Sequence, residues 1–281
     1  MTMPYNNVMK DILLIGPYIG DWKQEILTFR PYARWIYDQL DQPKCYISSH
    51  FNRHFLYDWI PEKNFIPVFE QLTRKETGQN NYMHSDINAK DYKILIKEFK
   101  QKITEKESIS VRDISLYNLS YLESTPHYSW YQKKFTKINL KPIKNDYIIY
   151  IPDKSISKSF NNKIYKALSE EYNNIVMVGD ENCHSLNDCI NFQINYPETG
   201  YELLIKYIMG CDFVITPCSH WTFLCNLQNI PVISWGMEGN IYKQNNDYGF
   251  NNKDNYILIS ENINRIIDAV RYFYFYKRRD K

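Results

Sequence analysis

Short apolar segments alternate with helix-like stretches in the second half of the chain, and this alternation restricts the fold more than any other feature. The segments DYIIYIP, NNIVMVGDE, CDFVITP and IPVISWG begin at residues 146, 173, 211 and 230. Each is a short, continuous apolar run, which is typical of a strand buried on both faces of a sheet. The polar-apolar stretches between them, such as SFNNKIYKALSEEY from Ser159, are predicted to be helices. Repeated strand-helix-strand units with short connections predict a parallel sheet with helices on both faces.

The first half of the chain shows the same pattern less clearly. DILLIGP from residue 11 is predicted to be a buried strand, followed by helix to about Leu40, with Pro31 either kinking that helix or starting a second one. KCYISS over residues 44–49 fits another strand, and residues 91–103 have the apolar spacing of a surface helix. The sequence therefore predicts two α/β halves.

We expect these halves to be two Rossmann-like α/β/α domains, residues 1–140 and 141–281, facing each other across a cleft. The linker is predicted near INLKPIKN, residues 138–145. With 281 residues, of which 44% are hydrophobic, the chain has enough apolar content for two folded domains. The polar segment over residues 73–86 is predicted to be a loop.

Charge and cysteine content exclude several classes of protein. The net charge of +2 is too small to indicate nucleic-acid binding by bulk electrostatics. The six cysteines form no CxxC pair and no zinc-site spacing, so we expect reduced thiols and no metal site. MTMPYNNVMKD lacks the apolar core of a signal peptide, and no apolar run approaches the roughly 20 residues of a membrane span. A cytoplasmic protein is predicted.

The abundance of Tyr, Asn, Lys and Ile suggests an AT-rich coding genome, as in some viruses and bacteria. If the source is viral, the predicted location becomes the host cytoplasm.

Glycines follow several of the predicted strands, at the ends where open α/β sheets bind ligands. Gly20, Gly179 and Gly236 are candidates for close approach to a ligand. The alternative is that each strand-to-helix turn needs glycine for its positive φ. Their concentration on one predicted edge favours a ligand site. Asp21 directly follows Gly20 and puts an acid at that edge.

The segment TPCSHWTF places small polar residues between a strand and a helix. Ser219 stands where the helix begins, so it either caps the helix or donates to a ligand. A helix start presents N–H groups and the positive end of a dipole, which suit a phosphate. His220 can add a donor or a positive charge, or it can be structural. In VGDE, Asp180 and Glu181 either accept hydrogen bonds from a ribose or are solvated.

Two stretches resemble one known family. FVITPCSHWTFLCNLQNIPVISWG and ILLIGPYIGD are similar to the heptosyltransferase-like family of GT-B-fold glycosyltransferases, which use nucleotide-diphospho-sugars. The resemblance implies a GT-B fold and a donor site in the second domain. It also implies that Asp21 is the catalytic base, because the family has an Asp in this loop. The family's phosphate-holding Ser/Thr and Lys, carried onto IPDKSISKSFNNK, imply roles for Ser155, Lys158 and Ser159, with Lys154 as a further candidate.

The second stretch departs from the family pattern of an acid followed by Ser/Thr and Gly. Cys218, Ser219 and His220 stand there instead, and Phe223 stands where the family has its His. His220 aligns with the His of the polysaccharide pyruvyl transferases, whose motif is Arg-x-His, and Cys218 replaces that Arg. A pyruvyl transferase, a nucleotide-sugar epimerase or a sugar- or nucleotide-binding protein without catalysis are therefore alternatives on the same fold.

The motifs of other enzyme classes are missing from the sequence. It has no P-loop, no GxGxxG, no GxSxG and no DxD acid pair. The resemblance makes an inverting glycosyltransferase without a cofactor, with the nucleotide-sugar as co-substrate, the leading hypothesis, and the missing DxD pair favours a metal-independent reaction. The acceptor is expected to be a glycan or, for a phage protein, a hydroxymethylated DNA base, which the aromatic and basic residues 120–137 and the terminal YKRRDK would suit. The sequence does not predict the oligomeric state.

Overall fold

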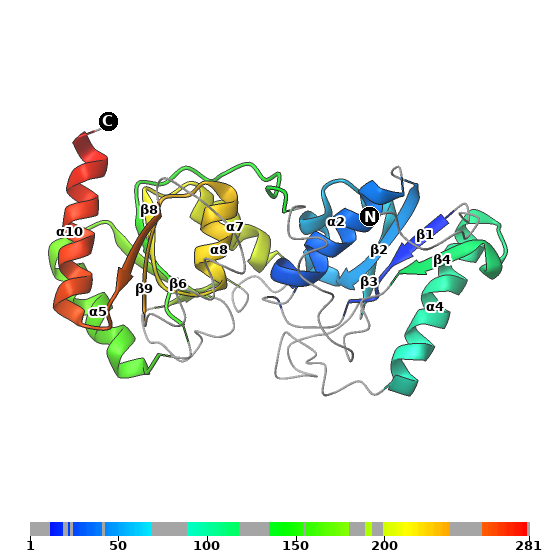
Figure 1. Cartoon of the computed structure of the whole chain (residues 1–281), viewed down its shortest axis with the longest axis horizontal. Coiled ribbons are helices and arrows are strands. Elements are labelled where there is room, and N and C mark those ends of the chain that lie inside the picture. The colour runs from blue at the N-terminus through cyan, green and yellow to red at the C-terminus, as the bar shows by residue number, and fades with distance from the viewer. Residues whose placement is uncertain are drawn as a thin grey trace. The chain divides into compact units, whose positions relative to one another are not determined.

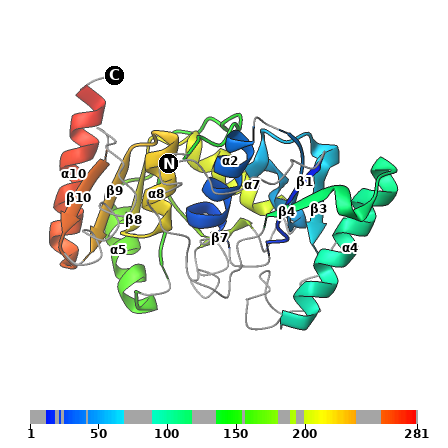
Figure 2. The ribbon, with the colours of Figure 1, turned by 45° about the vertical axis from the view of Figure 1, so that its right-hand side comes forward.

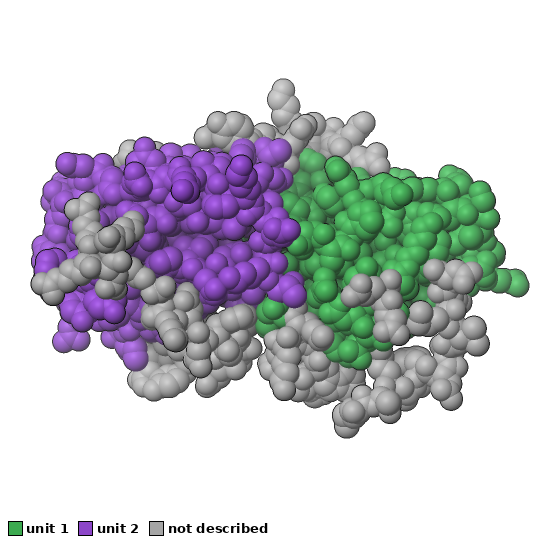
Figure 3. Space-filling view, turned by 90° about the horizontal axis from the view of Figure 1, so that it is seen from above, with its two compact units in different colours: residues 1–135 green, residues 136–281 purple. Residues whose placement is uncertain are grey.

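The structure is a computed structural model. It describes residues 12–18, 22, 25–40, 43–68, 89–117, 135–153, 156–179, 189–192, 199–236 and 255–279. The chain divides into two compact units, Met1–Phe135 and Thr136–Lys281, which Figure 3 colours separately. This division falls a few residues before the boundary expected at residues 140 and 141.

Unit 1 is built on a parallel sheet with the strand order β3-β2-β1-β4. Helices α2 (Arg30–Gln39) and α4 (Ala89–Glu107) lie on opposite faces of this sheet, as Figure 1 shows. Apolar side chains of α4, including Phe99 and Ile103, pack on Ile12 and Leu14 of the central strand. The strands are β1 (Ile12–Ile15), β2 (Lys44–His50), β3 (Phe65–Val68) and β4 (Ile114–Tyr117).

Four short helical turns complete the described part of unit 1. They are η1 (Glu25–Phe29), a π-helical turn directly before α2, and the 3-10 turns η2 (Phe51–Tyr57), η3 (Glu62–Asn64) and η4 (Val111–Asp113).

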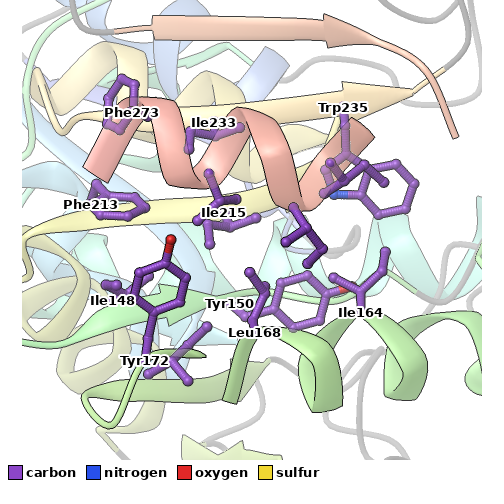
Figure 4. Packing of buried hydrophobic residues seen from close by; sticks show 14 of the residues in the cluster. Ile148, Tyr150, Ile164, Leu168, Tyr172, Phe213, Ile215, Ile233, Trp235 and Phe273 are labelled. Carbon is purple, nitrogen blue, oxygen red and sulfur yellow. The ribbon is translucent and has the colours of Figure 1, made fainter. Parts of the chain in front are cut away.

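Unit 2 has a parallel sheet with the strand order β10-β9-β8-β5-β6-β7. Alternate residues of its central strands face α5 (Lys158–Glu171) and α10 (Ile263–Arg279), where they form the core shown in Figure 4. Helices α7 (Gly200–Met209) and α8 (His220–Gln228) lie on the other face (Figures 1 and 2). The strands are β5 (Ile148–Tyr150), β6 (Ile175–Gly179), β7 (Ile190–Asn191), β8 (Phe213–Pro217), β9 (Val232–Gly236) and β10 (Asn255–Ile259).

The predicted α/β fold class is confirmed, because both sheets are parallel and carry helices on both faces. Pro31 lies in the first turn of α2, at the junction with the π-helical turn η1, and Phe29 at this junction keeps helical dihedrals (φ −70°, ψ −47°). The helical path therefore continues from η1 into α2 and does not break before Pro31. The sequence did not indicate the edge strands β3, β4, β7 and β10. The loop expected over residues 73–86 lies outside the described residues. No helix in the described parts is both long and apolar enough to cross a membrane.

Gly210 follows α7 and closes the helix. Its φ is −97°, so the left-handed conformation common at such positions is not used. A Cβ added at Gly210 would lie 1.8 Å from the carbonyl oxygen of Ile143. Close approach of two backbone segments therefore explains this glycine.

Candidate functional site

The strand order of unit 2 reverses beside β5, and this reversal locates the candidate site. From β5 the chain builds β6 and β7 on one side, then returns to build β8, β9 and β10 on the other side. All strands are parallel, so they end at the same edge of the sheet. In open α/β sheets, ligands bind outside the carboxyl ends of the strands at such a reversal. The segments after β5 and β8 therefore flank the expected binding position.

The segment after β5 leads into the start of α5. Ser157 caps this helix, since its hydroxyl oxygen accepts a hydrogen bond of 3.2 Å from the backbone N–H of Phe160. Lys158 and Ser159, both predicted phosphate contacts, are the first two residues of α5, and both are exposed. They lie at the positive end of the helix dipole, where an anion is stabilised.

Asn161 holds the loop before α5 in shape, and the sequence analysis missed it. Its side chain is 1% exposed. Its Oδ1 accepts a hydrogen bond of 2.7 Å from the Tyr150 hydroxyl, and its Nδ2 donates to the carbonyls of Asp153 (3.2 Å) and Ile156 (3.1 Å). The signal was available, because Asn161 is the one polar member of the buried stripe that also contains Ile164 and Leu168.

The segment after β8 leads into the start of α8, on the opposite face of the sheet. Ser219 is the N-cap: its Oγ accepts from the backbone N–H of Trp221 (3.2 Å), and its own N–H donates to the Thr222 hydroxyl (3.3 Å). The capping role is therefore present. The Ser219 hydroxyl also carries a hydrogen that can be donated to a ligand. His220 is the first residue of α8, 5% exposed, with its ring centroid 4.9 Å from that of Trp221.

Cys218 connects the ends of β8 and β9. Its N–H donates to the carbonyl of Trp235 (2.7 Å), and a Cβ added at Gly236 would lie 3.5 Å from the Cys218 Cβ. Burial raises the pKa of the Cys218 thiol to about 11, so the thiol is neutral at pH 7. No negative charge from this residue therefore opposes an anion at the start of α8.

Six of the predicted binding residues lie at the carboxyl edge of this one sheet. They follow or end four neighbouring strands and are Lys158, Ser159, Gly179, Ser219, His220 and Gly236. Gly179 ends β6, on the side of β5 away from β8. The other predicted site residues, Gly20, Asp21, Lys154, Ser155 and Glu181, lie outside the described residues, as does Asp180. Within the described residues, no three His, Cys, Asp or Glu side chains are grouped as a metal site would require.

The strand order of unit 1 also reverses, between β1 and β4, and the segment leaving β1 is held on several sides. The Gly16 N–H donates to the Tyr117 carbonyl (3.0 Å), and the Tyr18 N–H donates to the Ser48 carbonyl (2.9 Å). The Tyr92 hydroxyl of α4 donates to the Pro17 carbonyl (2.8 Å). Residues 16–18, which directly follow β1, are therefore tied to both neighbouring strands and to α4.

Replacing Gly16 by alanine is expected to lower the free energy of unfolding by about 1–3 kcal/mol. Gly16 has φ +106°, and an added Cβ would lie 2.4 Å from the carbonyl oxygen of Ser48, a backbone atom that cannot move alone. Urea unfolding followed by circular dichroism measures the change. A loss below about 0.5 kcal/mol, the range of neutral surface changes, would show that this close approach is not needed.

Unit 1 also contains a buried ionic network centred on Glu25. Glu25 of η1 and Arg53 of η2 are both 0% exposed, and Arg53 Nη1 donates to Glu25 Oε2. The Ser49 hydroxyl and the Tyr57 hydroxyl (2.6 Å) both donate to Glu25 Oε1. The guanidinium of Arg53 lies 5.5 Å from the ring centroid of Trp22. The network thus joins the residues after Asp21 to the end of β2 and to η2.

Burial changes the titration of two further groups near this network. Desolvation lowers the pKa of Arg30 to about 10, although the Asp58 carboxylate opposes the shift, so Arg30 stays charged at pH 7. Burial, and then the Glu25 carboxylate, raise the pKa of Tyr57 well above its usual value. Tyr57 therefore remains a hydrogen-bond donor to Glu25 throughout the physiological range.

Comparison with solved structures finds glycosyltransferases that align over most of this chain. An E. coli ADP-heptose LPS heptosyltransferase II gives a TM-score of 0.49 at 12% identity, over 95% of this chain and 99% of that one. E. coli heptosyltransferase WaaC with ADP gives a TM-score of 0.47 at 9% identity, over 93% of this chain and 99% of that one. A glycosyl transferase of family 9 from Veillonella parvula gives a TM-score of 0.48 at 10% identity, over 96% of this chain and 99% of that one. No protein-family model matches the chain, and no curated protein sequence does.

Proposed function

We propose that this chain is a glycosyltransferase that takes a sugar from a nucleotide-diphospho-sugar, with the donor diphosphate bound in unit 2. One observation carries the proposal. Two serine-capped helix starts, those of α5 and α8, follow the neighbouring strands β5 and β8 at the reversal of the strand order. The motif resemblance to heptosyltransferases supports the choice of ligand.

Two helix starts suit a ligand with two phosphates. Each presents first-turn N–H groups and a partial positive charge, and each is capped by a serine. Lys158 adds a full positive charge at α5, and the neutral Cys218 thiol adds none of opposite sign at α8. We assign Lys154, Ser155 and His220 to the same diphosphate, and Glu181 to the ribose. In a metal-independent reaction these groups stabilise the diphosphate as it leaves.

Asp21 is proposed as the general base. It accepts the proton of the acceptor hydroxyl while that oxygen bonds to the anomeric carbon and the bond to the diphosphate breaks. A single displacement of this kind inverts the configuration at the anomeric carbon. A base that works near neutral pH needs a pKa raised towards that range, which partial burial would supply. The proposed acceptor is a glycan or, in a phage, a hydroxymethylated DNA base. The cytoplasmic location of the protein stays a prediction.

A thermal-shift panel tests the proposal. Nucleoside diphosphates and their sugar conjugates are expected to raise the melting temperature more than nucleoside monophosphates, because a ligand of the folded state stabilises it. Lys158→Gln is expected to reduce this shift. Lys166→Gln, which changes another exposed lysine of α5 two turns further along, is the matched control and is expected to leave the shift unchanged.

The other outcomes separate the alternatives. A panel in which no diphosphate raises the melting temperature would refute the proposed donor site. Stabilisation by phosphoenolpyruvate alone would favour a pyruvyl transferase. Binding of a nucleotide-sugar without transfer to any acceptor or hydrolysis would favour a binding protein that lacks catalysis.

A further inference from the structure

Helix α10 exposes an aromatic stripe on the side opposite to the core. Its inner side buries Ile266, Val270 and Phe273 against the sheet (Figure 4). Its outer side exposes Tyr272 (65%), Phe275 (58%) and Tyr276 (54%). Spacings of three and four residues place these three side chains on one face of the helix. We name them the aromatic stripe of α10. Large aromatic side chains gathered on one exposed face mark interaction surfaces more often than scattered ones do.

The same helix concentrates positive charge. Between Ile263 and Arg279 it has five basic residues and one acidic residue. The whole chain has a net charge of only +2, so the remainder carries a slight excess of acidic residues. Lys277, Arg278 and Arg279 directly follow the aromatic stripe along the helix. The net charge of this one helix is more positive than the net charge of the whole chain, which indicates an anionic partner.

The acidic groups beside the stripe are already engaged. Arg271 donates from Nη1 to Asp268 (2.8 Å) and from Nε to Glu171 at the end of α5 (2.8 Å). Both carboxylates therefore share one guanidinium and are partly neutralised. Arg265 and the three basic residues after Tyr276 carry the remaining charge of the helix.

We propose that α10 is a docking surface for an anionic lipid membrane. Aromatic side chains partition into the headgroup region of a bilayer, and neighbouring Lys and Arg residues are attracted to anionic lipids. The exposed aromatic stripe and the basic residues that follow it supply these two kinds of contact, while the apolar side of α10 stays packed on the sheet. This proposal goes beyond sugar transfer and does not depend on it.

Two other partners fit the surface less well. A parallel two-fold contact between α10 helices of two copies would place their basic C-terminal segments against each other. A stable homodimer also buries about 1,200–2,000 Å² or more, beyond what a stripe of three side chains offers. Duplex nucleic acid would satisfy the basic run through its phosphates, but it leaves an aromatic stripe on a rigid helix without an apolar counterpart.

Co-sedimentation of the full chain with lipid vesicles tests the proposal. We expect binding to phosphatidylcholine vesicles in which about a third of the lipid is phosphatidylglycerol, weakening as salt rises. We expect little binding to phosphatidylcholine alone. Lys277→Glu with Arg278→Glu, and separately Tyr272→Ser with Phe275→Ser and Tyr276→Ser, should each weaken binding at least about tenfold.

The matched control is Ile94→Ser with Val111→Ser, which removes two apolar side chains of unit 1 that are each 47% exposed. It is expected to bind vesicles like the unchanged chain. Melting curves of all variants show that they are folded. Absence of vesicle binding at low salt, or equal binding by the stripe variant, would overturn the proposal. Binding of duplex DNA without vesicle binding would also overturn it. A dimer that the substitutions in the aromatic stripe dissociate would do the same.

Discussion

Replacing Asp21 by asparagine is expected to abolish sugar transfer and to leave donor binding nearly intact. Asparagine keeps the shape of the side chain but cannot accept the proton of the acceptor hydroxyl. Loss of a general base typically lowers the rate of the chemical step about 10²- to 10⁴-fold. Product formation gives kcat, and the thermal shift with the diphosphate donor gives its binding in the same preparation.

Glu62→Gln is the control, because Glu62 is another acid of unit 1, exposed and in η3. It should retain near-normal turnover. Near-normal turnover of Asp21→Asn would instead remove Asp21 from the role of base. Equal loss of donor binding and turnover would show that Asp21 shapes the donor site rather than taking a proton.

Replacing Arg53 by methionine is expected to lower the free energy of unfolding by about 3–5 kcal/mol. The change leaves the Glu25 carboxylate buried, with the hydroxyls of Ser49 and Tyr57 as neutral partners and no opposite charge. Total stabilities are about 5–15 kcal/mol, so this would be a large fraction. Urea unfolding measures the loss of stability. Where the two units unfold separately, a spectroscopic probe placed in unit 1 follows the unfolding of that unit.

The partly exposed pair of Arg34 and Asp38 provides the control. It joins residues four apart on α2 with side chains 23% and 18% exposed, and Arg34→Met should cost about 1 kcal/mol, since it also loses the contact with the Trp59 ring. Adding Glu25→Leu to Arg53→Met should recover part of the loss, since no uncompensated charge then stays buried. Equal costs for Arg53→Met and Arg34→Met would show that the buried pair contributes little.

The central strands could be predicted because their signal is local. β5, β6, β8 and β9 are continuous apolar runs between polar residues, as strands buried on both faces must be. β3 is short and contains Pro67, β7 has only two residues, and the polar segment before β10 obscures it. Their pairing depends on the neighbouring strand more than on their own residues, so the sequence pattern did not indicate them.

The residues of the candidate site also differ in whether a local sequence signal could reveal them. Ser219 at a strand-to-helix turn could be found, because capping is a local property of residues next to one another. Asn161 acts through Tyr150, and Glu25 acts through Arg53, which lies 28 residues further along the chain. Such contacts exist only after the elements have packed. A buried polar residue in an apolar helical stripe was the one available clue, and only Asn161 carried it clearly.

The proposed donor site places a nucleoside diphosphate at the starts of α5 and α8. Hydrogen–deuterium exchange of the full chain, with and without the diphosphate that gives the largest thermal shift, tests this placement most directly. We expect slower amide exchange in the first turns, residues 158–160 and 220–222, and little change in α2 of unit 1. A diphosphate that binds and leaves both first turns unchanged would contradict it.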